Sequence, residues 1–120
     1  MDDELKALNF HIVHVGMNAK DMPSAEAAAN DFFAAFGFSP DKRSASVFAG
    51  PQIEIMSGVA GTGTHGHLAL GTSNIEKAAE YLKKKGYAFK AGSEKYKDKK
   101  MIAVYLEKEF SGFAVHLLQC

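Results

Sequence analysis

"HLALGTSNIEKAAEYLKKKGY", residues 67–87, predicts a strand that leads directly into a helix. Leu68 and Leu70 alternate with small residues, so they belong to one face of the strand and His67 to the other. The helix carries apolar residues at helical spacing, and Gly86 is placed to end it. This apolar stripe consists of Ile75, Ala78, Ala79 and Leu82. We expect the leucines to pack under the helix, which leaves the histidine on the opposite face of the strand.

An earlier part of the chain repeats this order. Residues 10–17 alternate as a strand does, and residues 24–38 predict a helix with Ser24 as its N-cap and Gly37 as its C-cap. Each helix is followed by short strands, which we expect at 44–50, 52–58, 101–109 and 113–119. The pattern therefore indicates an internal duplication of a strand, a helix and further strands.

The duplicated halves span about 10–58 and 67–119, with the glycine-rich segment 58–66 as the hinge between them. No Lys-Ser or Lys-Thr follows these glycines, so the hinge is not a phosphate-binding loop. A length of 120 residues favours one domain over residues 1–120. The composition, 47% apolar and 23% charged, is typical of a soluble globular protein.

Charge and hydropathy exclude several classes of partner. The formal net charge is zero, which argues against nucleic-acid binding, and we expect the basic stretch Lys95–Lys100 to be a solvated loop. The sequence contains no membrane span and no secretory signal at its acidic start. The single cysteine, Cys120, has no internal disulfide partner. These features predict a cytoplasmic protein.

A repeated detail marks a candidate site. In "VHV" (13–15), "IEI" (53–55) and "VHL" (115–117) an ionisable residue lies between two aliphatic residues. At His67 only the following residue, Leu68, is large. Strand periodicity puts all four of these ionisable residues on the face away from the helices, namely His14, Glu54, His67 and His116. Three imidazoles and one carboxylate suit zinc, nickel, iron(II), cobalt or manganese, whereas calcium and magnesium prefer oxygen ligands.

The remaining candidates are weaker. A lone histidine on a strand is more often exposed or part of the core than a ligand. His11 has the parity of the aliphatic residues around it, and His65 lies at the mouth of its strand, where we expect it to be exposed. Tyr105 and Met56 have the parity to line the same cavity, although such side chains commonly just fill space.

Together these motifs resemble the vicinal oxygen chelate superfamily. "HVGMNAKD" (14–21) resembles its opening strand motif, "IEI" its strand with a metal-binding Glu, and "GFAVHLLQ" (112–119) its final strand. The segment 67–87 resembles the restart of its second module, with the ligand His at its head. The superfamily includes glyoxalase I, extradiol dioxygenases, fosfomycin-resistance enzymes and bleomycin-binding proteins. The resemblance covers about residues 10–119.

This resemblance implies an α+β fold in which two βαβββ modules pair into a curled sheet around a central cavity. It places His14, Glu54 and His67 at three ligand positions and His116 at the fourth, where the family usually has Glu. In glyoxalase I that Glu is both ligand and proton-transfer base, so the catalytic base here is unassigned. The only arginine is Arg43, which argues against a pocket for glutathione carboxylates and against a standard lactoylglutathione lyase.

The chain also resembles a small glyoxalase-like domain linked by name to bacterial keto-hydroxyglutarate and keto-deoxy-phosphogluconate aldolases. An aldolase barrel needs at least roughly 200 residues, so this chain is not an aldolase by itself. We expect a metal-binding protein acting on a small α-hydroxycarbonyl or α-keto-acid-type substrate through chelation of paired oxygens, as a lyase, isomerase or dioxygenase. The alternative is a metal-free small-molecule binding or accessory domain without catalysis.

The open modules and the flexible hinge favour a homodimer. An open half-barrel sheet cannot cover its second face alone, so two modules must pair, within one chain or between two. The first helix and its exit are rich in aromatic residues, among them Phe36. Some of these side chains could form an interface between chains, although such residues more commonly fill a core. We predict a module-swapped homodimer in which His14 and Glu54 come from one chain and His67 and His116 from the other.

Overall fold

The computed structural model describes residues 2–58 and 62–120. Its helices are α1 (Asp3–Leu8), α2 (Met22–Phe36) and α3 (Ile75–Lys84). The strands are β1 (His11–Ala19), β2 (Pro40–Lys42), β3 (Ser46–Ala49), β4 (Ile53–Ser57), β5 (Gly66–Thr72), β6 (Lys95–Lys97), β7 (Lys100–Tyr105) and β8 (Phe113–Gln119). The sequence β1-α2-β2-β3-β4 followed by β5-α3-β6-β7-β8 is the expected pair of βαβββ modules.

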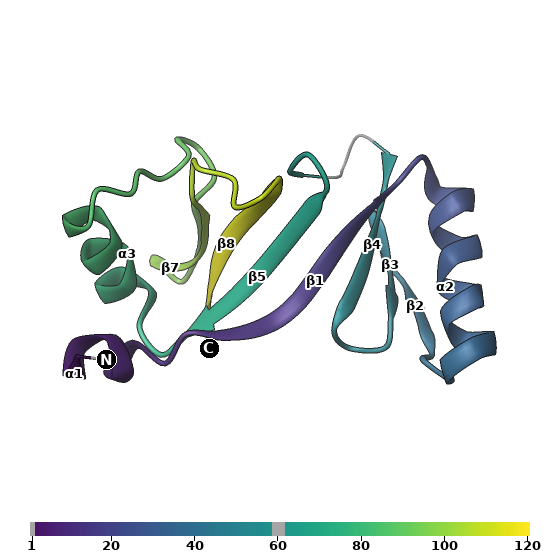
Figure 1. Ribbon diagram of the computed structural model, residues 1–120, viewed down its shortest axis with the longest axis horizontal. Coiled ribbons are helices and arrows are strands. Elements are labelled where there is room, and N and C mark those ends of the chain that lie inside the picture. The colour runs from purple at the N-terminus through teal and green to yellow at the C-terminus, as the bar shows by residue number, and fades with distance from the viewer. Residues whose placement is uncertain (1, 59–61) are drawn as a thin grey trace.

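The eight strands of the described residues form one mixed sheet in the order β2-β3-β4-β1-β5-β8-β7-β6. At its centre β1 and β5 pair antiparallel, while β4 lies parallel to β1 and β8 parallel to β5. An approximate twofold axis between β1 and β5 therefore relates the modules. The sheet curls between α2 at one end of the molecule and α3 with α1 at the other (Figure 1).

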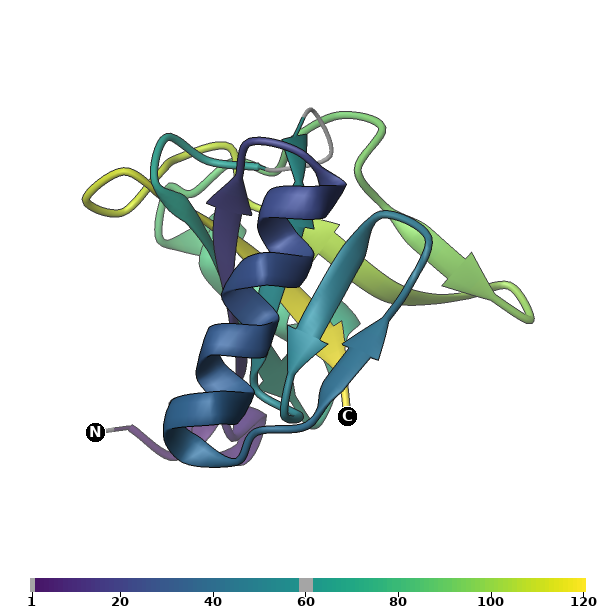
Figure 2. The same cartoon turned by 90° about the vertical axis from the view of Figure 1, so that its right-hand side faces the viewer.

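Each module has its own apolar core between its helix and its strands. The core under α2, which crosses in front of the first module's strands in Figure 2, consists of Ala25, Ala29, Val47, Ala49 and Ile55. The core under α3 consists of Leu8, Ile75, Ala78, Tyr81, Val104, Leu106, Val115 and Leu117, with Leu68 and Leu70 packed against it. The aliphatic neighbours of Glu54 and His116 thus lie in the cores, which confirms the predicted division of the strand faces.

The ends of α2 and α3 follow ordinary capping chemistry. Asp21, not Ser24 as predicted, is the N-cap of α2, because its carboxylate accepts a hydrogen bond from the backbone N–H of Ser24 at 2.8 Å. Gly37 ends α2 with a φ of +78°, as predicted. The side chain of Asn74 caps the start of α3, and Gly86 follows that helix with a φ of +97°.

Several short elements were not predicted. They are the helix α1, which has fewer than two turns, and the strands β2 and β6, which have three residues each. Elements this short show no clear periodicity. The stretch Lys95–Lys100, expected as a loop, forms an exposed hairpin in which β6 pairs with β7. Of the predicted stripe of α3, Ile75, Ala78 and Ala79 are buried, whereas Leu82 is only partly buried. Tyr81, which was not predicted as part of the stripe, is buried.

The two modules meet within a single chain. Residues 59–61 of the predicted hinge lie outside the described residues, but β1 and β5 on either side of it pair directly. Completing the sheet therefore does not require the predicted exchange of modules between two chains, and the homodimer stays a prediction. Among the described helices, none is long and apolar enough to cross a bilayer.

Candidate metal centre

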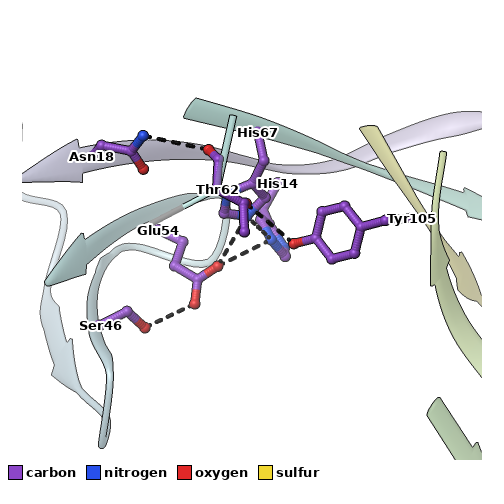
Figure 3. Close-up of polar contacts among 7 residues, drawn as sticks. All are labelled: His14, Asn18, Ser46, Glu54, Thr62, His67 and Tyr105. Carbon is purple, nitrogen blue, oxygen red and sulfur yellow. Dashed lines mark hydrogen bonds and ion pairs between the residues drawn. The ribbon is translucent and has the colours of Figure 1, made fainter. Parts of the chain in front are cut away.

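The four predicted ligands converge at the centre of the sheet. They are His14 on β1, Glu54 on β4, His67 on β5 and His116 on β8. Oε1 of Glu54 lies 3.3 Å from Nε2 of His14 and 3.2 Å from Nε2 of His67, and these two nitrogens are 3.2 Å apart (Figure 3). One nitrogen from each histidine lies within 4.8 Å of the others.

Strand register explains this convergence. In one row across the sheet, Gly16 of β1 pairs with Glu54 on one side and His67 on the other. In the next row, Ala69 of β5 pairs with His14 and His116. The middle residue of each row is small, so the larger side chains on both sides of it have room to turn toward the centre.

Gly16 is the tighter of these two middle residues. A Cβ at Gly16 would overlap the ring of His67, so this ring lies directly over the backbone of β1. His67 is 1% exposed, which leaves its ring no free space to move into. The absence of a side chain at Gly16 therefore determines where the imidazole of His67 lies.

The carboxylate of Glu54 is held from both ends. Ser46 Oγ donates a hydrogen bond of 2.8 Å to Oε2, which leaves Oε1 to face His14 and His67. Burial alone would raise the pKa of Glu54, but hydrogen bonds from these histidines and from Ser46 outweigh it and hold the pKa well below its usual range. Glu54 is therefore ionised at neutral pH and is the one negative charge in the cluster.

His116 contributes a neutral imidazole. Its burial, together with the charges of His67 and His14, lowers its pKa to about 4. The ring centroid of Tyr105 lies 4.5 Å from that of His116, and the Tyr105 hydroxyl lies 3.4 Å from Oγ1 of Thr62. Burial raises the pKa of Tyr105, so its hydroxyl remains a proton donor at neutral pH.

Two ring nitrogens in this cluster are buried without a hydrogen-bond partner among the described residues, Nδ1 of His67 and Nε2 of His116. Buried polar atoms normally have partners, and exceptions require an explanation. A metal ion bound by the cluster would be the missing partner of Nε2 of His116. The imidazole and carboxylate donors also match the ligands that divalent transition metals prefer. The residues therefore fit such an ion.

The other candidates take minor places. His11 is exposed, and its Nδ1 lies 2.8 Å from the backbone oxygen of Asn9. His65 is exposed as expected, with its ring centroid 6.2 Å from that of Phe113. Tyr105 does line the site, whereas Met56 is partly buried on β4.

Sequence reasoning missed Ser46, Gly16 and Ala69. Ser46 lies eight residues before Glu54 and reaches it only because β3 and β4 form a hairpin. Gly16 and Ala69 did leave a signal, because each follows a predicted ligand histidine by two residues at the start of its module. The pattern of His, any residue and a small residue was therefore visible in both halves.

The family model of the Glyoxalase/Bleomycin resistance protein/Dioxygenase superfamily matches residues 5–117 of this chain. The chain belongs to this superfamily. The cluster of three histidines is consistent with a divalent metal site typical of the superfamily. No match was found among curated proteins.

Several solved structures share the fold. A Streptomyces coelicolor methylmalonyl-CoA epimerase variant in complex with 2-nitronate-propionyl-CoA is 16% identical, with a TM-score of 0.64, covering 90% of this chain and 95% of that one. A methylmalonyl-CoA epimerase in complex with methylmalonyl-CoA and NH4+ is 17% identical, with a TM-score of 0.61, covering 90% and 92%. A hypothetical protein from Bacillus halodurans is 12% identical, with a TM-score of 0.64, covering 93% and 95%.

At sequence identities this low, the similarity shows only a shared fold. The similar structures are methylmalonyl-CoA epimerases and a protein of unassigned activity rather than aldolase-associated domains. The predicted resemblance to an aldolase-linked domain is therefore not supported, whereas the resemblance to the glyoxalase superfamily is confirmed.

Proposed function

We propose that this chain binds one divalent transition metal ion through His14, Glu54, His67 and His116. The observation that carries this proposal is the convergence of three imidazoles and one ionised carboxylate from four strands. Zinc, nickel, iron(II), cobalt and manganese all accept this ligand set. A bound divalent ion would supply Lewis-acid chemistry by polarising an oxygen of a ligand.

The proposed ligand is a small α-hydroxycarbonyl or α-keto-acid-type molecule that offers two neighbouring oxygens. Around it, Ser46 keeps Glu54 in place, Gly16 keeps the ring of His67 in place, and Tyr105 offers a protonated hydroxyl. Any turnover would be a lyase, isomerase or dioxygenase reaction. Glu54 is committed to two histidines, so we assign no catalytic base.

Metal analysis tests this proposal directly. Tag-free protein purified without chelators should contain, or take up on titration, about one equivalent of a divalent transition metal per chain. His14→Ala and His67→Ala should each lower the affinity for this metal by about 100-fold or more, because each removes a ligand. His11→Ala and His65→Ala are matched controls, since both remove an exposed histidine outside the cluster. Uptake below about a tenth of an equivalent by the unaltered protein contradicts the proposal.

One observation favours a second function, a metal-free binding or accessory domain. Glu54 is already paired with His14, His67 and Ser46, so its carboxylate needs no metal to be satisfied. Thermal shift separates the two functions, because a ligand stabilises the state that binds it. Stabilisation by small keto acids or by methylmalonyl-CoA in the presence of a chelator supports the metal-free function, whereas stabilisation only with added metal supports the metal centre.

A further inference from the structure

A cavity of about 530 Å³ lies beside the candidate metal centre. Tyr105, Ala114 and Thr62 are part of its lining, and Tyr105 is also in contact with the ring of His116. Ala114 precedes His116 by two residues on β8, so both side chains point to the same face of the sheet. Tyr105 therefore lies between His116 and this cavity, and none of the four proposed ligands lines the cavity itself.

The charged residues around the cavity do not favour an anion by themselves. Two lysines and three glutamates line it, namely Lys90, Lys95, Glu94, Glu107 and Glu109. Glu109 accepts hydrogen bonds from the backbone N–H and the hydroxyl of Thr64. Of these residues, Lys95 has a charge that acts on His116. Any preference for charged ligands must therefore come mainly from the metal centre.

The ligand set determines the charge of that centre. Metal-bound imidazoles are neutral, so the three histidines contribute no charge and Glu54 contributes −1. With a divalent ion the centre carries +1. A glutamate in place of His116 would bring the centre to zero. In a buried site the attraction between the centre and an anion a few ångströms away is strong. A change of one unit in the charge of the centre therefore changes the affinity for the anion strongly.

Resting on the metal site proposed above, we propose that His116 makes the loaded centre selective for small anionic ligands. The positive charge of the centre attracts an anionic oxygen or nitrogen donor. Tyr105 adds a hydroxyl that donates a hydrogen bond to the anion. In this assignment His116 sets the class of ligand as well as holding the metal.

Azide is a suitable probe because it is a small monoanion at pH 7.5, and neutral imidazole at pH 8 is the uncharged comparison. Both would be titrated into Co(II)-loaded protein, followed by the visible absorption of Co(II) and by calorimetry. His116→Glu should weaken azide binding by about tenfold or more, while imidazole binding changes by less than about threefold. His116→Gln keeps the neutral charge, so its azide affinity should stay within about threefold of the unaltered protein.

Each outcome bears on the proposal. Equal azide affinity in His116→Glu and the unaltered protein overturns it, and so does an equal loss in both His116 variants, because that loss would reflect ligand geometry and not charge. Metal titration without azide is measured first. If the unaltered protein binds no metal, the proposed function fails; if it binds metal and the azide results do not depend on charge, only this inference fails.

A smaller pair of variants repeats the comparison if His116→Glu or His116→Gln does not fold. His116→Asp changes the charge of the centre by one and His116→Asn leaves it unchanged, while both remove the same imidazole. We expect azide to bind about tenfold or more weakly to Co(II)-loaded His116→Asp than to His116→Asn. Equal azide affinities for these two variants would overturn the proposal.

Discussion

Two rows of residues cross the centre of the sheet, and they differ although the modules are duplicates. One row is Glu54–Gly16–His67 and the other is His116–Ala69–His14. The twofold relation matches Gly16 with Ala69 and Glu54 with His116. The first row is therefore charged and sterically tight, while the second is neutral and has room for a methyl group. Duplication provided the framework of the site, and single residues then made its halves unequal.

The largest effect should come from Gly16→Ala. The added methyl group would overlap the ring of His67, which is buried and cannot turn away. We expect metal affinity to fall by about 100-fold or more, and the free energy of unfolding to fall by about 1–3 kcal/mol through overpacking. Metal titration and denaturant unfolding measure the two effects.

Gly71→Ala is the matched control for this variant. Gly71 pairs with His11 across the same two strands, and a Cβ there would also meet an imidazole ring and the sulfur of Cys120. Both of these side chains are exposed and can move aside. Gly71→Ala should leave metal affinity within about twofold. An equal loss in both variants would remove the special role of Gly16.

Glu54, in the charged row, should matter more to the metal than His116, its counterpart in the neutral row. Glu54→Gln removes the negative charge of the cluster with little change in shape, and we expect it to weaken metal binding by about 100-fold. His116→Gln removes a neutral ligand, and we expect a loss of about tenfold. Competition with a chromophoric chelator measures both affinities. A larger loss for His116→Gln would reverse the ranking of these two residues.

The rows should also separate in the acid unfolding of the metal-free protein. His116 has a pKa of about 4 when folded against 6.5 as the reference, so the unfolded chain binds a proton first as the pH falls. Stability is then lost between about pH 6.5 and 4, by up to about 3 kcal/mol. Glu54 has a lowered pKa, so its contribution is present above its reference value of 4.5 and is lost below it.

Variants can show which residue causes the loss of stability in each of these two pH ranges. His116→Gln should flatten the dependence of unfolding free energy on pH between 6.5 and 4, whereas Glu54→Gln should flatten it only below about pH 4.5. Denaturant unfolding at a series of pH values, with His65→Gln as a control for an exposed histidine, measures both slopes. An unchanged slope above pH 4.5 in His116→Gln would mean that this side chain is not a buried neutral histidine.

The smallest expected effect concerns the pairing of the modules. Because β1 and β5 pair within one chain, each chain contains both rows. Mixing His14→Ala and His67→Ala subunits should therefore restore no metal binding, even if light scattering finds a dimer. Recovery of about a quarter of the sites after unfolding and refolding an equimolar mixture would instead support the exchange of modules between chains.

Much of the fold could be predicted because local periodicity reports it. The alternation in β1, β5 and β8 and the stripe of α3 are properties of neighbouring residues, so the order of the modules and the outward face of the four ligands followed from them. The N-cap of α2 was misplaced because Asp21 and Ser24 both suit that position, and only the backbone shows which side chain accepts the bond.

Which residues share a face could be read from the sequence, because strand periodicity is local. Glu54, His67 and His116 point away from the helices for the same reason that their aliphatic neighbours pack in the cores. The distances between these side chains could not be read from the sequence, because they depend on the register between strands far apart in the chain. That register put Gly16 beneath the ring of His67, Ser46 beside Glu54 and Tyr105 against His116. It also joined both modules within one chain.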